Sequence, residues 1–65
     1  MKSIGENIKK LRIKKNLTQK ELANKLFICR QSISKWEKGL SYPQVTIIND
    51  LIKVLECTYE ELFDF

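Results

Sequence analysis

A chain of 65 residues is large enough for one domain and too short for two. Hydrophobic residues make up 43% and charged residues 31%, a globular balance, and no apolar run approaches the length of a membrane span. The two cysteines, Cys29 and Cys57, stand without any histidine, which excludes a Cys/His zinc site and argues against a disulfide framework. We therefore expect one cytoplasmic domain over residues 1–65 that needs no metal or cofactor and has no small-molecule ligand pocket.

Charge is distributed unevenly along the chain. Residues 1–41 carry eleven basic and three acidic side chains, a net charge of +8, whereas residues 42–65 carry one basic and five acidic side chains, a net charge of −4. A basic body with an acidic end indicates an anionic partner for one face only. A solvated surface with scattered lysines explains the same numbers and stays open at this point.

The first predicted helix covers residues 3–15. Ser3 can cap its beginning, and Glu6 stands three residues later, as in a capping box. Its apolar residues recur at helical spacing: Ile4, Ile8 and Leu11. Asn16 is expected to end the helix in a left-handed conformation.

The second and third predicted helices, residues 18–26 and 30–38, are joined by only three residues. Thr18 and Glu21 form the next capping box. The inward-facing residues of the pair are Leu22, Ala23, Leu26 and Ile33, with Trp36 as a further candidate. Gly39 suits the position just past the end of the third helix.

The fourth and fifth predicted helices cover residues 44–55 and 59–63. Pro43 fits at or near the first turn of the fourth, whose broad apolar stripe is Val45, Ile48, Leu51, Ile52 and Leu55. Thr58 and Glu61 cap the fifth, which packs back through Leu62 and Phe63. The sequence thus predicts an all-α fold, a compact five-helix bundle without a sheet, with a core of Ile8, Leu11, Leu22, Leu26, Ile28, Ile33, Ile48, Leu51 and Leu55.

Two short helices with so brief a connection form a helix-turn-helix arrangement, over about residues 18–38. In that arrangement the first helix braces the second, whose outer face is free to enter the major groove of DNA. The outer face of the helix at 30–38 carries short polar groups and cations, the types that hydrogen-bond base edges and phosphates: Arg30, Gln31, Ser32, Ser34, Lys35 and Lys38. An ordinary helical hairpin with a solvated polar face is the competing interpretation.

The stretch LTQKELANKLFICRQSISKWEKGLSYPQ closely resembles the Cro/C1-type (XRE) helix-turn-helix domain of bacterial and phage regulators. The resemblance extends through the fourth helix to Glu61-Leu62-Phe63 and so covers nearly the whole chain. It implies a lambda-repressor-like bundle that binds a double-stranded DNA operator, usually as a homodimer. The function it implies is sequence-specific transcriptional regulation, repression in particular, and no enzymatic activity.

The resemblance also implies roles for individual residues. Contacts with bases and adjacent phosphates fall to Arg30, Gln31, Ser32 and Lys35. Contacts with the DNA backbone fall to Thr18, Gln19, Ser34 and Lys38, and possible phosphate contact to Arg12. Arg12 also matches one half of a structural salt bridge, with Glu37 as the other half.

Two positions depart from the pattern of the family. Phe27 stands where glycine is usual in the turn, and a left-handed backbone there costs a residue with a β-carbon about 1 kcal/mol or more. Cys29 stands where serine or threonine usually caps the reading helix, and cysteine is a weak cap. The sequence leaves open whether the turn is strained or adopts another conformation.

The same residues also bear on other classes of function. No catalytic constellation is visible, which argues against an enzyme. Surplus apolar residues would suit a protein-interaction module, such as an antitoxin or anti-repressor, or a homodimer interface: Ile13, Ile47, Val54, Tyr59, Phe63 and Phe65. Cys29 at a helix beginning would suit redox sensing, although inert packing explains it more simply, and Cys57 reads as a core residue. Single-stranded RNA binding lacks the aromatic side chains expected on the basic face.

Overall fold

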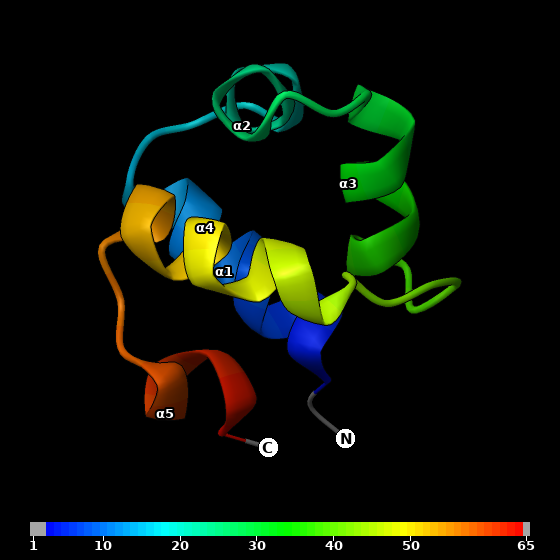
Figure 1. Cartoon of the computed structure of the whole chain (residues 1–65). Coiled ribbons are helices and arrows are strands. Elements are labelled where there is room, and N and C mark those ends of the chain that lie inside the picture. Colours follow the sequence, from blue (N-terminus) through cyan, green and yellow to red (C-terminus); the bar gives the residue numbers. More distant parts are fainter. Residues whose placement is uncertain (1–2, 65) are drawn as a thin grey trace.

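The computed structural model describes residues 3–64 and shows five helices without a strand in that part of the chain (Figure 1). They are α1 (Ile4–Lys14), α2 (Gln19–Leu26), α3 (Arg30–Glu37), α4 (Val45–Leu55) and α5 (Tyr59–Phe63). The predicted all-α five-helix bundle is confirmed, and each predicted boundary differs from the observed one by no more than one residue. The Cα atoms fill a nearly isotropic body of 26 × 24 × 23 Å.

Local side-chain chemistry accounts for where the helices begin. In α2 and α5 the capping box is complete: the threonine hydroxyl accepts from the glutamate amide, and the glutamate carboxylate accepts from the threonine amide. These hydrogen bonds lower the pKa of Glu21 and of Glu61 below the usual glutamate value, the Thr18 and Thr58 amides being the largest causes. At α1 the Ser3 hydroxyl accepts from the Glu6 amide at 3.3 Å.

Left-handed residues end or follow the helices. Asn16 (φ 58°) and Gly39 (φ 75°) take this conformation after α1 and α3, as the sequence predicts. Phe27 (φ 58°) and Glu56 (φ 52°) take it at the ends of α2 and α4. The chain thus reverses at Phe27 through a left-handed residue, the conformation that costs a residue with a β-carbon about 1 kcal/mol or more.

The core lies where all five helices meet around α1 and α4 (Figure 1). Eight of the nine predicted core residues are buried; the ninth, Ile28, is half-buried and packs against the core from the α2–α3 turn. The predicted inward role of Val45 is wrong, because this first residue of α4 is 83% exposed. Leu62 is fully buried, but its neighbour Phe63 lies at the surface, 36% exposed. Ile4 and Trp36 complete the buried set alongside Ala23.

Helix α1 holds α3 and α5 in place through two residues with small or polar side chains. Gly5 lies against the main chain of Trp36, so that a β-carbon at Gly5 would overlap the carbonyl group there. Asn7 is the buried polar residue among residues 3–64, and its Nδ2 donates to the carbonyl oxygens of Leu62 (2.9 Å) and Asp64 (3.0 Å). The side-chain amide therefore fastens the end of α5 to the first helix.

The surplus apolar residues divide into two kinds. Ile47 and Val54 are half-buried on α4 and pack against the core, as does Cys57 after it. Ile13 and Tyr59 are exposed by 54% and 53%. Phe65 lies outside the described residues.

Candidate nucleic-acid interface

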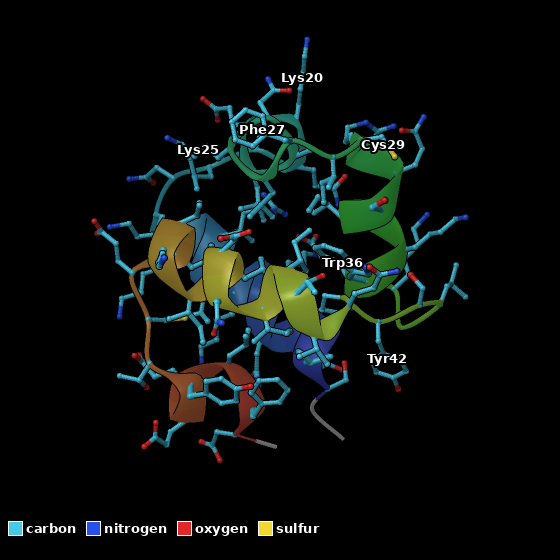
Figure 2. All side chains as sticks on the ribbon, viewed as in Figure 1. Lys20, Lys25, Phe27, Cys29, Trp36 and Tyr42 are labelled. Carbon is cyan, nitrogen blue, oxygen red and sulfur yellow. The ribbon has the colours of Figure 1, made fainter. Side chains whose placement is uncertain are left out.

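The outer face of α3 forms a shallow hollow of about 230 Å³. Its lining brings together five of the side chains that the sequence assigned to DNA, together with one apolar residue: Arg30, Gln31, Ser34, Lys35, Lys38 and Leu40. Three of these six are cations, and no carboxylate lines the hollow. Helix α3 stands at one side of the molecule with this face directed away from α4 (Figure 2). The hollow can therefore receive an anionic, hydrogen-bonding surface.

Ser32 lies apart from that group. It is half-buried and lines a different groove, between α3 and α4, that also contains Trp36 and Tyr42. Its hydroxyl oxygen lies 3.4 Å from the Sγ atom of Cys29. Ser32 therefore sits at the margin of the outer face, where the first turn of α3 begins.

Thr18 and Gln19 occupy the beginning of α2. Thr18 is exposed and its hydroxyl oxygen accepts from the Glu21 amide, so the O–H group remains available as a donor to a ligand. Gln19 is half-buried and lies between the two ends of α3: its Nε2 donates to Oε1 of Glu37 at 3.0 Å, and its Oε1 accepts from Nη1 of Arg30 at 3.2 Å. The side chain of Gln19 thus braces the helix that carries the outer face.

Arg12 and Glu37 form the ion pair between α1 and α3. Nε of Arg12 lies 2.7 Å from Oε2 of Glu37, Nη2 donates to Oε1 at 3.1 Å, and Nη1 donates to the carbonyl oxygen of Leu17 at 2.7 Å. The two side chains are only 11% and 4% exposed. All three guanidinium nitrogens are thus occupied within the protein, which leaves Arg12 little surface to offer a phosphate.

The turn between α2 and α3 exposes both unusual residues. Phe27 is 94% exposed and lies at the end of α2 in the upper part of the molecule (Figure 2). Cys29 occupies the N-cap position of α3, with no side-chain hydrogen bond to the helix amides. The α3 beginning is therefore held by its neighbours in the fold rather than by its own cap.

The two thiols differ in acidity. The Ser32 hydroxyl, as the largest cause, and then the nearby amide of Ser32 lower the pKa of Cys29 below the ordinary thiol value. Burial raises the pKa of Cys57, and the charge of Glu61 adds to the effect. Within residues 3–64 no three histidine, cysteine, aspartate or glutamate side chains gather as metal ligands, and none of the helices there is long and apolar enough to cross a membrane.

The acidic end of the chain lies on another side of the molecule. Helix α5 stands below α1 and α4, away from the upper half formed by α2 and α3 (Figure 1). It carries Glu60 and Glu61, and the rings of Tyr59 and Phe63 stack on it with centroids 5.0 Å apart. Cations of α1 lie beside this end, because Lys10 and Lys14 line a groove together with Glu61 and Asp64. The acidic end is therefore separated in space from the outer face of α3, but not from all of the basic side chains.

Two short helices joined by a tight turn, with the second held at both ends and presenting a cationic outer face, define a helix-turn-helix domain. The chain belongs to the helix-turn-helix family of the Cro/C1 (XRE) type, whose family model matches residues 8–62.

Among curated proteins, the chain is similar to the HTH-type transcriptional activator BcrR of Enterococcus faecalis, at 42% identity over 89% of this chain and 28% of BcrR. It is 41% identical to the HTH-type transcriptional regulator DicA of Escherichia coli, over 86% of this chain and 42% of DicA. An HTH-type transcriptional regulator of Archaeoglobus fulgidus is 34% identical over 89% of this chain and 82% of its own length. The chain thus spans less than half of BcrR and of DicA.

Two solved structures share the fold. The P22 c2 repressor, in complex with a synthetic operator, superimposes with a TM-score of 0.88 at 27% identity and covers 97% of this chain and 96% of its own. The restriction-modification controller protein C.AhdI of Aeromonas hydrophila superimposes with a TM-score of 0.84 at 28% identity over 92% of this chain and 91% of its own. The lambda-repressor-like fold predicted from the sequence is confirmed.

Proposed function

We propose that the protein is a sequence-specific, double-stranded DNA-binding transcriptional regulator of the cytoplasm that acts as a repressor. The observation that carries the proposal is the outer face of α3, where Arg30, Lys35 and Lys38 share one hollow with Gln31 and no carboxylate. Cations supply affinity for the phosphate backbone, and amide and guanidinium groups read base edges in the major groove.

In the proposed complex, different residues contact the bases and the DNA backbone. Arg30, Gln31 and Lys35 face the base edges, with Ser32 at the margin of this group. The backbone is met at the beginning of α2 and along α3 by Thr18, Gln19, Ser34 and Lys38. We assign Arg12 a structural role, as the partner of Glu37, and no phosphate contact, because its side chain is only 11% exposed.

A homodimer is part of the proposal. One reading helix covers only a few base pairs, and two helices related by a dyad enter successive major grooves about 34 Å apart. The stacked Tyr59 and Phe63 rings are the exposed apolar surface that we assign to the contact between copies. This arrangement turns the acidic α5 away from the DNA.

The test is selection of bound duplexes from a random pool, followed by titration of the selected duplex at several salt concentrations. We expect a site with dyad symmetry and a steep loss of affinity with salt, because counterions are released when cations meet phosphates. Absence of duplex binding at every salt concentration would support the alternative, a protein-interaction module of the same fold. A selected site without dyad symmetry would remove the dimer from the proposal and leave DNA binding intact.

The direction of regulation needs its own experiment. The solved P22 neighbour is a repressor and BcrR is an activator. With the selected site placed over the start of a reporter gene, a repressor lowers expression in proportion to occupancy. Expression that rises with the protein, from a site placed upstream of the same promoter, would replace repression with activation.

A further inference from the structure

We propose that Leu40 is a specificity-determining residue that reads the 5-methyl group of a thymine in the operator, an inference that rests on the proposed DNA-binding function. Leu40 is the one apolar side chain among the residues lining the hollow on α3. It is 71% exposed, so burial in the fold does not account for a leucine there.

The position of Leu40 is set by the way α3 ends. Gly39, with φ 75°, reverses the chain, and its amide donates to the carbonyl oxygen of Trp36 at 3.1 Å. The Leu40 amide donates to the carbonyl oxygen of Lys35 at 2.9 Å. These two bonds are the Schellman motif, which anchors the main chain of Leu40 to the last turn of the helix. The side chain is therefore presented from a fixed point beside Lys35 and Lys38.

An apolar residue after such a helix end commonly packs against an apolar residue in the last turn. In this chain the residue at that position in the last turn is Lys35, a cation that lines the same hollow. The usual structural reason for an apolar side chain at this position is thus weak. A single exposed leucine is ordinary on a protein surface, so what distinguishes Leu40 is its place among the polar and cationic side chains that line the hollow. Here the surroundings are the face assigned to DNA.

The chemistry of the major groove leaves few partners for such a side chain. Its base edges display hydrogen-bond donors and acceptors, and the thymine methyl is the apolar group among them. Leu40 stands at the C-terminal end of the hollow, opposite the first turn that carries Arg30 and Gln31. A thymine toward one edge of each half-site is therefore the base that Leu40 distinguishes, while the first turn reads other base pairs.

Duplexes are selected from a random pool with the wild-type chain and with Leu40→Ala. The wild type should select a thymine at one position of each half-site. Leu40→Ala should show no preference for thymine at that position. Replacing that thymine by uracil removes only the methyl group, and we expect roughly fourfold weaker wild-type binding, the worth of one buried methyl. The same replacement should leave the affinity of Leu40→Ala unchanged. For Leu40→Met, whose side chain is also large and apolar, we expect uracil to weaken binding almost as much as it does for the wild type.

Val45→Ala is the matched control, because Val45 is equally apolar, 83% exposed, and outside the hollow. It should keep both the selected sequence and the uracil penalty. Equal uracil penalties in the wild type and Leu40→Ala would overturn the inference and assign Leu40 to the sugar wall of the groove or to the helix end alone. Failure of the wild type to bind any duplex would instead overturn the proposed function itself, so the two failures are distinguishable.

Discussion

Gly5 and Trp36 join α1 to α3 through main-chain contact: a β-carbon on Gly5 would lie 1.8 Å from the Trp36 carbonyl oxygen. The carbonyl belongs to the main chain of α3 and cannot move without moving the helix, so Gly5→Ala must separate the two helices. A small domain holds only about 3–5 kcal/mol of stability, and overpacking of this kind costs about 1–3 kcal/mol or more. We expect Gly5→Ala to be at best marginally folded, with a much lower urea midpoint than the wild type in titrations followed by circular dichroism.

Gly39→Ala is the matched control for that substitution. Gly39 has no heavy atom within 4 Å of where a β-carbon would stand, but its φ of 75° disfavours any side chain. The cost should be about 1–2 kcal/mol, from backbone strain alone. If both variants lost the same modest stability, the close approach of α1 and α3 would not exist in solution.

Removal of Glu37 should destabilise the protein at least as much as Gly5→Ala, for a different reason. In Glu37→Ala the Arg12 guanidinium, 11% exposed, loses its carboxylate partner. Breaking a buried pair on one side costs roughly 3–5 kcal/mol, so the variant should be largely unfolded at room temperature. The control is Lys15→Ala, which breaks the exposed pair with Glu56 and should cost under about 1 kcal/mol. An unchanged melting temperature for Glu37→Ala would mean that water screens the pair.

The turn at Phe27 predicts a substitution that stabilises the protein. Phe27 is 94% exposed, so removing its side chain takes almost no buried apolar surface from the fold. Glycine adopts the left-handed conformation of this residue without steric strain. Phe27→Gly should gain up to about 1 kcal/mol, measured as a higher urea midpoint with an unchanged slope. Phe27→Ala keeps the strain and should stay near the wild type. A loss of stability in Phe27→Gly would show that the turn adopts another conformation in solution.

Residues that contact bases should be distinguishable from residues that contact phosphates when the affinity of each variant is measured for several duplexes at two salt concentrations. Gln31→Ala should cost about 1–3 kcal/mol on the selected site and relax preference at one base position, because glutamine can bind adenine through two hydrogen bonds. Lys38→Ala should weaken all duplexes alike and lower the salt slope by about one unit. Equal losses on every duplex for Gln31→Ala would contradict its assignment to a base.

The cysteines should differ in alkylation by iodoacetamide, followed by mass spectrometry as a function of pH. Cys29 is exposed and its pKa is lowered by hydrogen bonding with Ser32, whereas burial and Glu61 raise the pKa of Cys57. The thiolate is the reactive form, so Cys29 should react first and at a lower pH. Ser32→Ala should slow the reaction of Cys29 only. Similar rates for both thiols would show that the hydrogen bond to Ser32 is not kept in solution.

Local chemistry made most of the fold predictable. The capping boxes at Thr18 and Thr58 and the glycine at position 39 set helix ends, and the spacing of apolar residues found the core. The wrong prediction, that Val45 faces inward, depends on tertiary position. Val45 matches the apolar stripe of α4 but lies at the first turn of the helix, beyond the reach of the other helices. The sequence around Gly5 did not predict its contact with α3, because that close approach depends on Trp36, 31 positions away in the chain.

The candidate interface was predictable to a similar extent. Helical periodicity places Arg30, Gln31 and Lys35 on one face, and the structure gathers them in one hollow. Periodicity does not reveal that Ser32 turns toward the α4 groove, or that the loop after Gly39 returns Leu40 to the same face. Both depend on how α3 is seated and how it ends.

The hydrogen bonds of Gln19 carry a consequence for the energetics of the proposed complex. Its amide spans α3 from Arg30 to Glu37, so the orientation of that helix is settled when the chain folds. The conformational entropy of orienting α3 is therefore lost before DNA arrives and is not subtracted from the affinity, which still bears the cost of ordering the exposed side chains. Association then has the thermodynamics of two preformed surfaces docking, with a heat-capacity change set by the area they cover and no coupled folding.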